Sequence, residues 1–142
     1  MKLFTTVEFD SAHRLSFHTG KCKNLHGHRW KAEVEIELDK SKCSSDMLID
    51  FGIVKESITK KFDHKTLVYK QDDVMMELAE IFEHLGLDYE IFNFELTAEN
   101  LAEYICNEIS TLVAKQKGLG ISDIKVKVKL FETPNNSVEF IV

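Results

Sequence analysis

Strict alternation of apolar and polar residues marks two strands of the chain. In residues 29–39, five apolar side chains alternate with charged ones, and residues 123–131 set isoleucine, valine and leucine against lysines. Such alternation is typical of antiparallel strands that have one face on a core and the other in water. Shorter apolar patterns predict two further strands, at residues 3–9 and 138–142.

Helical periodicity fills the region between these strands. Apolar residues at helical spacing follow Asp50 and recur in residues 73–85, where Gly86 ends the pattern, and a third helix runs from Thr97 to about Gly118. The order of strands, helices and strands predicts an α+β fold in which helices pack on one face of an antiparallel sheet. The apolar side expected to pack in the second helix consists of Val74, Leu78, Ile81, Phe82 and Leu85.

Composition narrows the class of protein. The 142 residues, 44% of them apolar, suit a single globular domain over residues 1–142. A net charge of −6 argues against a nucleic-acid binder, and no apolar run is long enough to cross a membrane. The first residues lack the long apolar region of a signal peptide, and an odd count of three cysteines predicts free thiols. We therefore expect a cytoplasmic protein whose thiols are Cys22, Cys43 and Cys106.

One segment is basic, although the chain as a whole carries a negative net charge. Residues 11–32 contain five lysines or arginines, four of the six histidines and no acidic residue. The segment suggests a site for an anion, although charge alone favours a solvated basic loop. The cations are Arg14, Lys21, Lys23, Arg29 and Lys31.

Three histidines in that segment have the spacing of a metal site. His26 and His28 are two apart, so they point to one face of a strand, and they share parity with the apolar residues of 29–39. If the strands at residues 3–9 and 29–39 both extend as far as these histidines, His13 points to the same face as His26 and His28. Three imidazoles with an open fourth position suit catalytic zinc, whereas Cys22 as fourth ligand would close a structural site. Buried histidines without metal are the third interpretation.

Two further motifs carry ionisable groups. Asp63 and His64 follow the first helix, where the histidine could simply complement the helix dipole or could act with the carboxylate as a proton relay. Glu132 falls on the same face of its strand as the apolar residues of 124–130, so its carboxylate needs a partner on the buried face. A lysine would satisfy it, and so would a ligand with two adjacent N–H donors.

Six short blocks follow one another along nearly the whole chain, among them Phe9 to Leu15, Cys22 to His28 and Asp63 to Leu67. In this order they resemble the 6-pyruvoyl-tetrahydropterin synthase family. The resemblance implies a tunnelling fold, with trimers that close into a barrel and stack head to head as hexamers with active sites between subunits. It implies zinc bound by the three histidines, and Cys22 as the base, with Asp63 and His64 as the relay. It also implies that Glu132 and Thr97 hold the pterin ring. The blocks are residues 9–15, 22–28, 49–51, 63–67, 97–102 and 129–133.

Within the family, the spacing of Cys22 selects a branch. Three residues separate it from His26, as in the branch that makes 6-carboxy-tetrahydropterin for queuosine, and a glutamate would mark the folate branch instead. The implied substrate is 7,8-dihydroneopterin triphosphate, and acetaldehyde and triphosphate leave. The alternatives are the 6-pyruvoyl reaction, a zinc- or pterin-binding module without turnover, and a structural protein without metal. Two departures from the family pattern are the long segment 70–92 and Leu96, which stands where proline is common.

Overall fold

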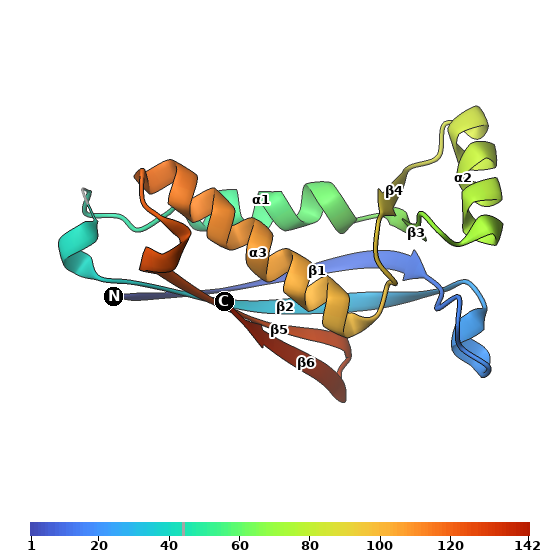
Figure 1. The fold of residues 1–142 in the computed structure, drawn as a ribbon, viewed down its shortest axis with the longest axis horizontal. Coiled ribbons are helices and arrows are strands. Elements are labelled where there is room, and N and C mark those ends of the chain that lie inside the picture. The colour runs from blue at the N-terminus through green and yellow to red at the C-terminus, as the bar shows by residue number, and fades with distance from the viewer. Residues whose placement is uncertain (44) are drawn as a thin grey trace.

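The chain folds into a six-stranded sheet with three helices (Figure 1). The computed structural model describes residues 1–43 and 45–142. The strand order is β4-β3-β1-β2-β5-β6. The helices are α1 (Phe51–Phe62), α2 (Asp73–Leu85) and α3 (Ala98–Lys117). The strands are β1 (Lys2–His13), β2 (His26–Leu38), β3 (Lys65–Tyr69), β4 (Tyr89–Phe92), β5 (Ile124–Thr133) and β6 (Asn136–Ile141).

The long strands β1, β2, β5 and β6 pair antiparallel, as the alternation predicted. Their even and odd positions divide into a buried inner face and a polar outer face. On β2 the inner residues from Trp30 to Leu38 are almost completely buried, and β5 contributes Ile124 to Leu130 in the same way. The pattern therefore identified both the strands and the face that forms the core.

The outer face of the sheet is held by opposite charges across β2 and β5. Glu35 lies opposite Lys127, and the lysine Nζ is 3.1 Å from a carboxylate oxygen. Glu33 lies opposite Lys129, and Glu37 opposite Lys125. Each such cross-strand pair contributes roughly 0.2–1 kcal/mol, so the polar face fixes the register as well as contacting water.

Helices α1 and α3 cover the inner face, where α1 packs on β1 and α3 packs on β5 and β6 (Figure 1). Their predicted caps are confirmed: Asp50 accepts a hydrogen bond from the Gly52 N–H, and Thr97 accepts one from Asn100. Gly118 ends α3 with a left-handed φ of 65°, a conformation that favours glycine. In the described part of the chain, the helices fall short of the length and apolarity that a membrane crossing demands.

The short strands β3 and β4 are additions that the sequence did not indicate. They run parallel to β1 and to each other, which makes the sheet mixed while the α+β class stands. Their five and four residues are too few to show a period. Helix α2 and strand β4 account for most of the long segment 70–92.

The packing side expected for α2 is wrong for three of its five residues, while Leu78 packs on the core and Phe82 is partly buried. Met75 and Ala79 are the buried residues of the helix, and they contact Val68 of β3. Three residues of the expected side are more than half exposed: Val74, Ile81 and Leu85. Strands β3 and β4 at this edge of the sheet are short, so they cover only a narrow stripe of α2. The rest of its apolar side remains exposed.

Candidate metal centre and active site

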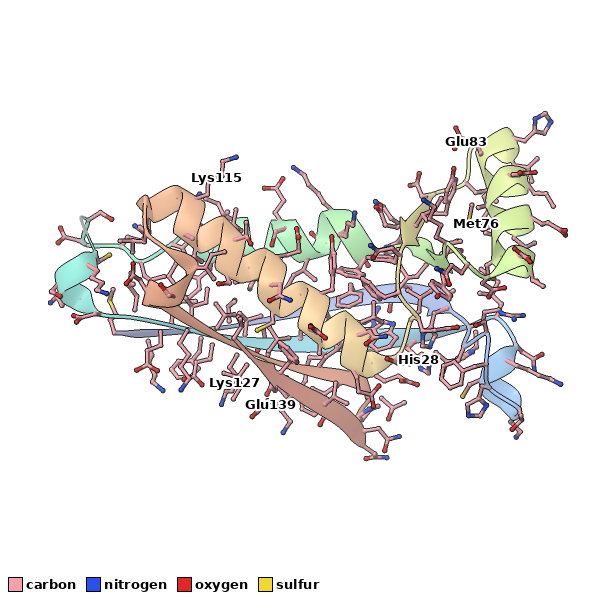
Figure 2. All side chains as sticks on the ribbon, in the orientation of Figure 1. His28, Met76, Glu83, Lys115, Lys127 and Glu139 are labelled. Atoms are coloured by element: carbon pink, nitrogen blue, oxygen red, sulfur yellow. The ribbon has the colours of Figure 1, made fainter. Side chains whose placement is uncertain are left out.

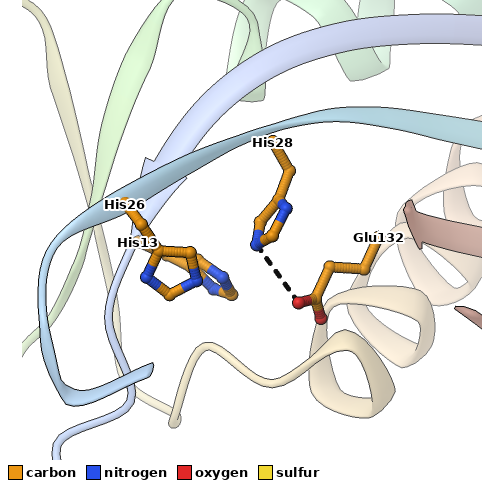
Figure 3. A group of neighbouring side chains, drawn as sticks. All are labelled: His13, His26, His28 and Glu132. Carbon is orange, nitrogen blue, oxygen red and sulfur yellow. Dashed lines mark ion pairs between the residues drawn. The ribbon is translucent and has the colours of Figure 1, made fainter. Parts of the chain in front are cut away.

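The three histidines meet where β1 ends and β2 begins. His13 is the last residue of β1 and lies opposite His26, the first of β2, while His28 follows on the same face. Ring centroids are 4.7 Å apart for His13 and His26 and 4.8 Å for His26 and His28. Both strands thus extend toward each other as the parity argument required, and the predicted convergence of the three rings is confirmed (Figure 3).

Hydrogen bonds at the far side of two rings set their tautomers. The Nδ1 of His13 lies 2.7 Å from the Leu96 carbonyl, and the Nδ1 of His26 lies 2.7 Å from the Asn24 carbonyl. Because a carbonyl only accepts, each Nδ1 carries the proton and each Nε2 keeps its lone pair. The Nε2 atoms of His13 and His28 are buried and have no hydrogen-bond partner among the described residues. Free imidazole lone pairs with anchored rings are what a metal requires, so the group fits zinc.

Burial favours the neutral form of two of these rings, His13 and His28. It lowers the pKa of His13 to about 4, and it lowers the pKa of His28 although Glu132 opposes the shift. Trp30 lies beneath the group, fully buried, with its ring 5.2 Å from that of His13. At neutral pH these two imidazoles can therefore bind a cation without first losing a proton.

Glu132 joins the histidines from β5. Its Oε1 lies 3.1 Å from the Nε2 of His28, along the dashed line of Figure 3. One potential ligand atom of each of the four residues lies within 4.8 Å of the others. This position confirms that Glu132 points to the inner face. The group near its carboxylate is the His28 ring, without hydrogen-bond geometry between them, rather than the lysine that the sequence also allowed. The four residues together could hold a metal ion.

Cys22 lies outside this group, in the loop that joins β1 to β2. It sits in a 3-10 turn, Lys21–Lys23, and its carbonyl accepts a hydrogen bond from the Leu15 N–H at 2.9 Å, which closes the loop. Its side chain is partly exposed. The closed structural site with Cys22 as fourth ligand therefore has less support than a site that Cys22 flanks. Cys106, by contrast, is core: burial raises its pKa to about 11, which keeps the thiol protonated.

Asp63 and His64 lie between the end of α1 and the start of β3, outside the group of three histidines. The His64 Nδ1 is 2.9 Å from Asp63, and both are grouped with the outward-facing carboxylate of Asp10. The Asp10 N–H donates to Asp63 at 2.9 Å and holds the pKa of that carboxyl below its usual range. The His64 ring is largely exposed. Within one chain, the relay pair and the histidine group form two separate groups, and His64 and His28 border the same open hollow.

Three of the five cations in the basic segment are already paired within the chain. Arg14 contacts Asp72 at 2.7 Å, Arg29 binds both carboxylate oxygens of Asp10, and Lys31 contacts Glu33. Lys21 and Lys23 are exposed and form no ion pair with the described residues. These two lysines, beside Cys22, are the cations left for an anionic ligand. His18 lies in the same loop and outside the histidine group.

Sequence reasoning missed the groups that orient the site. The Leu96 carbonyl fixes His13, yet a backbone group leaves no mark in a sequence. Leu96 also precedes Thr97, so the segment that caps α3 touches the metal group directly. Asp10 could have been found from the sequence, because the alternation along β1 places it on the outer face, opposite Arg29.

A family model described as 6-pyruvoyl tetrahydropterin synthase matches residues 2–141. The chain belongs to the 6-pyruvoyl tetrahydropterin synthase family. Membership in this family indicates an enzyme of pterin chemistry. The recognition from six sequence blocks is thereby confirmed.

Curated relatives within the 6-pyruvoyl tetrahydropterin synthase family include the 6-carboxy-5,6,7,8-tetrahydropterin synthases of Rickettsia bellii and Haemophilus influenzae. The first is 33% identical over 98% of this chain and 99% of its own length. The second is 34% identical over 98% of this chain and 97% of its own.

Solved structures of the family share the fold. An uncharacterized protein from Wolinella succinogenes superposes with a TM-score of 0.73 at 18% identity, over 99% of this chain and 97% of its own. The Plasmodium vivax 6-pyruvoyl tetrahydropterin synthase gives a TM-score of 0.64 at 16% identity, over 100% and 98%. At such low identity the superpositions show the tunnelling fold alone.

Proposed function

We propose that this chain converts 7,8-dihydroneopterin triphosphate to 6-carboxy-5,6,7,8-tetrahydropterin, with release of acetaldehyde and triphosphate. The observation that carries the proposal is the convergence of His13, His26, His28 and Glu132 at the inner face. Relatives that bear the 6-carboxy name over nearly their whole length support this branch. The overall reaction takes up one water and needs no external oxidant or reductant. Three cysteines without disulfides suit a reducing cytoplasm.

The three histidines would hold a zinc ion through their Nε2 atoms. When bound there, zinc would act as a Lewis acid toward the hydroxyl groups of the substrate side chain. Leu96 and Asn24 keep two of the rings in the tautomer that this binding needs. Zinc binding at this group is part of the proposed function, and it can be measured without an assay of turnover.

Each remaining group has a chemical task. Cys22, as a thiolate, would take a proton from the carbon next to a substrate hydroxyl. Glu132 would accept the ring N–H and 2-amino donors of the pterin in a bidentate pair, with Thr97 beside it. Lys21 and Lys23 would neutralise part of the triphosphate.

The relay pair would serve a neighbouring copy of the chain. His64 and its orienting partner Asp63 are grouped with Asp10 and lie outside their own histidine group, so we assign them to the site of another subunit. This assignment relies on the trimers, stacked as hexamers, that the family resemblance implies. His64 would then exchange the second proton with the substrate, with Asp63 holding the ring.

The test is one incubation of zinc-loaded protein with 7,8-dihydroneopterin triphosphate, with mass spectrometry of the products and trapping of any aldehyde. We expect acetaldehyde and 6-carboxy-5,6,7,8-tetrahydropterin in equal amounts. Formation of 6-pyruvoyl-tetrahydropterin without acetaldehyde would move the chain to the other branch. Folded, zinc-loaded protein without turnover would refute the enzyme and favour a binding module.

A further inference from the structure

One residue of β1, Asp10, contacts both members of the relay through its backbone. The Asp10 N–H donates to Oδ1 of Asp63 at 2.9 Å, and the Asp10 carbonyl accepts a hydrogen bond from the His64 N–H at 2.7 Å. The second oxygen of Asp63, Oδ2, lies 2.9 Å from the His64 Nδ1. The relay is therefore held by one residue of β1 as well as by the end of α1.

The backbone of His64 shows how closely the relay is held. Its φ of 57° lies in the left-handed region, and in the part of the chain that the structure describes no other residue apart from glycine has a positive φ. Such conformations persist where the surrounding structure fixes them, and they cluster at functional sites. The hydrogen bond to the Asp10 carbonyl helps to fix this conformation, so the place of His64 depends on where β1 puts Asp10.

Arg29 of β2 holds the side chain of Asp10. The two residues lie directly opposite each other, and the guanidinium donates to both carboxylate oxygens, from Nε at 3.0 Å and from Nη2 at 2.8 Å. A forked pair of this kind fixes orientation as well as distance, which a lysine does not do. Hydrogen bonds from Arg29 also hold the pKa of the Asp10 carboxyl below its usual range, so this carboxylate stays charged.

The exposure of the Asp10–Arg29 pair argues against a role in stability. The side chains of Arg29 and Asp10 are 69% and 41% exposed, and an exposed ion pair contributes little to folding. Other pairs of this kind lie on the outer face of the sheet, such as Lys127 with Glu139, both labelled in Figure 2. Asp10 differs from them because its carboxylate lies within 4.8 Å of a potential ligand atom of each member of the relay.

We propose that Asp10 and Arg29 are positioning residues of the relay. Arg29 fixes Asp10 across the two strands, and Asp10 in turn fixes the carboxylate of Asp63 and the backbone of His64. The part of the relay in turnover belongs to the proposed function, on which this inference rests. Because the relay acts in the chemical step and holds no part of the substrate, its displacement lowers kcat and leaves KM unchanged.

The first test compares two variants that remove the fork. Asp10→Ala leaves the backbone hydrogen bonds possible and removes the carboxylate, whereas Arg29→Lys keeps the positive charge and loses the forked geometry. In each zinc-loaded variant we expect kcat to fall by ~10–100-fold with KM and zinc content unchanged, because a small misplacement of a reacting group has effects of this size. Circular dichroism checks that both variants fold.

Lys2→Gln is the matched control. Lys2 pairs with Glu35 at 2.6 Å across the same two strands and lies eight residues from Asp10 along β1, so its kcat should stay within about twofold of wild type. A wild-type kcat in Asp10→Ala or in Arg29→Lys, or an equal loss in Lys2→Gln, would overturn this inference alone. Absence of turnover in wild type would refute the proposed function and the relay with it.

A double variant tests whether the two residues act as one unit. Once Asp10 has lost its carboxylate, Arg29 has nothing left to hold near the relay. Asp10→Ala/Arg29→Lys should therefore be no slower than the slower of the two single variants. A loss equal to the product of the two single losses would show that the residues act separately and would contradict the inference.

Discussion

The His28→Ala protein is expected to lose zinc on dialysis and to lose turnover by more than ~100-fold. Groups that only orient metal ligands cost 10–100-fold when removed, so loss of a ligand costs at least as much. His28 is the best choice because it is partly exposed, whereas removal of the buried His13 would also leave a cavity. Metal analysis after dialysis and the product assay measure the two losses.

His18→Ala is the matched control. His18 comes from the same loop region, is exposed, and lies outside the histidine group. We expect this variant to keep its zinc and its turnover, and circular dichroism checks that both proteins fold. A full complement of zinc in the His28→Ala protein would show that the metal does not bind at this group.

The Cys22→Ala protein is expected to keep its zinc and to lose turnover by about 10²–10⁴-fold, the usual contribution of a general base. Cys22 is outside the group of His13, His26, His28 and Glu132, so we expect that its side chain is not needed to hold the metal. Cys43→Ala, which also removes a partly exposed thiol, should leave both properties unchanged. Loss of zinc from the Cys22→Ala protein would favour the closed structural site instead.

Mixed assemblies test which subunit supplies the relay. Neither Cys22→Ala nor His64→Ala should turn over alone. Co-expressed in equal amounts, the two variants should regain about a quarter of wild-type activity. If a site takes Cys22 from one subunit and His64 from its neighbour, random assembly leaves both intact in one site of four. No recovery in mixed assemblies would place both groups of a site in the same chain.

The inner face of the site was predictable because strand parity is strict. Trp30 and the apolar positions after it fixed the face of His28, and the register of β1 with β2 then brought His13 opposite His26. The same argument placed Glu132 on the inner face of β5. Here the buried core and the site lie on one face, so a period of two residues indicates both.

Other features depend on contacts that no local pattern records. Strand β3 exists because Ser11 and Lys65, far apart in the sequence, pair in parallel. The buried side of α2 depends on the same strand, so the helix was predicted correctly and its packing side only in part. The hydrogen bond from His13 to the Leu96 carbonyl joins residues 83 apart through a backbone group.

X-ray absorption at the zinc edge tests the central claim most directly. The account predicts zinc with a first shell of nitrogen and oxygen alone, at ~2.0–2.2 Å, from His13, His26, His28 and a non-sulfur fourth ligand. The same spectrum should be obtained from the Cys22→Ala protein. A sulfur shell at ~2.3 Å that vanishes with Cys22→Ala would contradict the account and show a closed structural site. Purified protein that binds no zinc at all would contradict it as well.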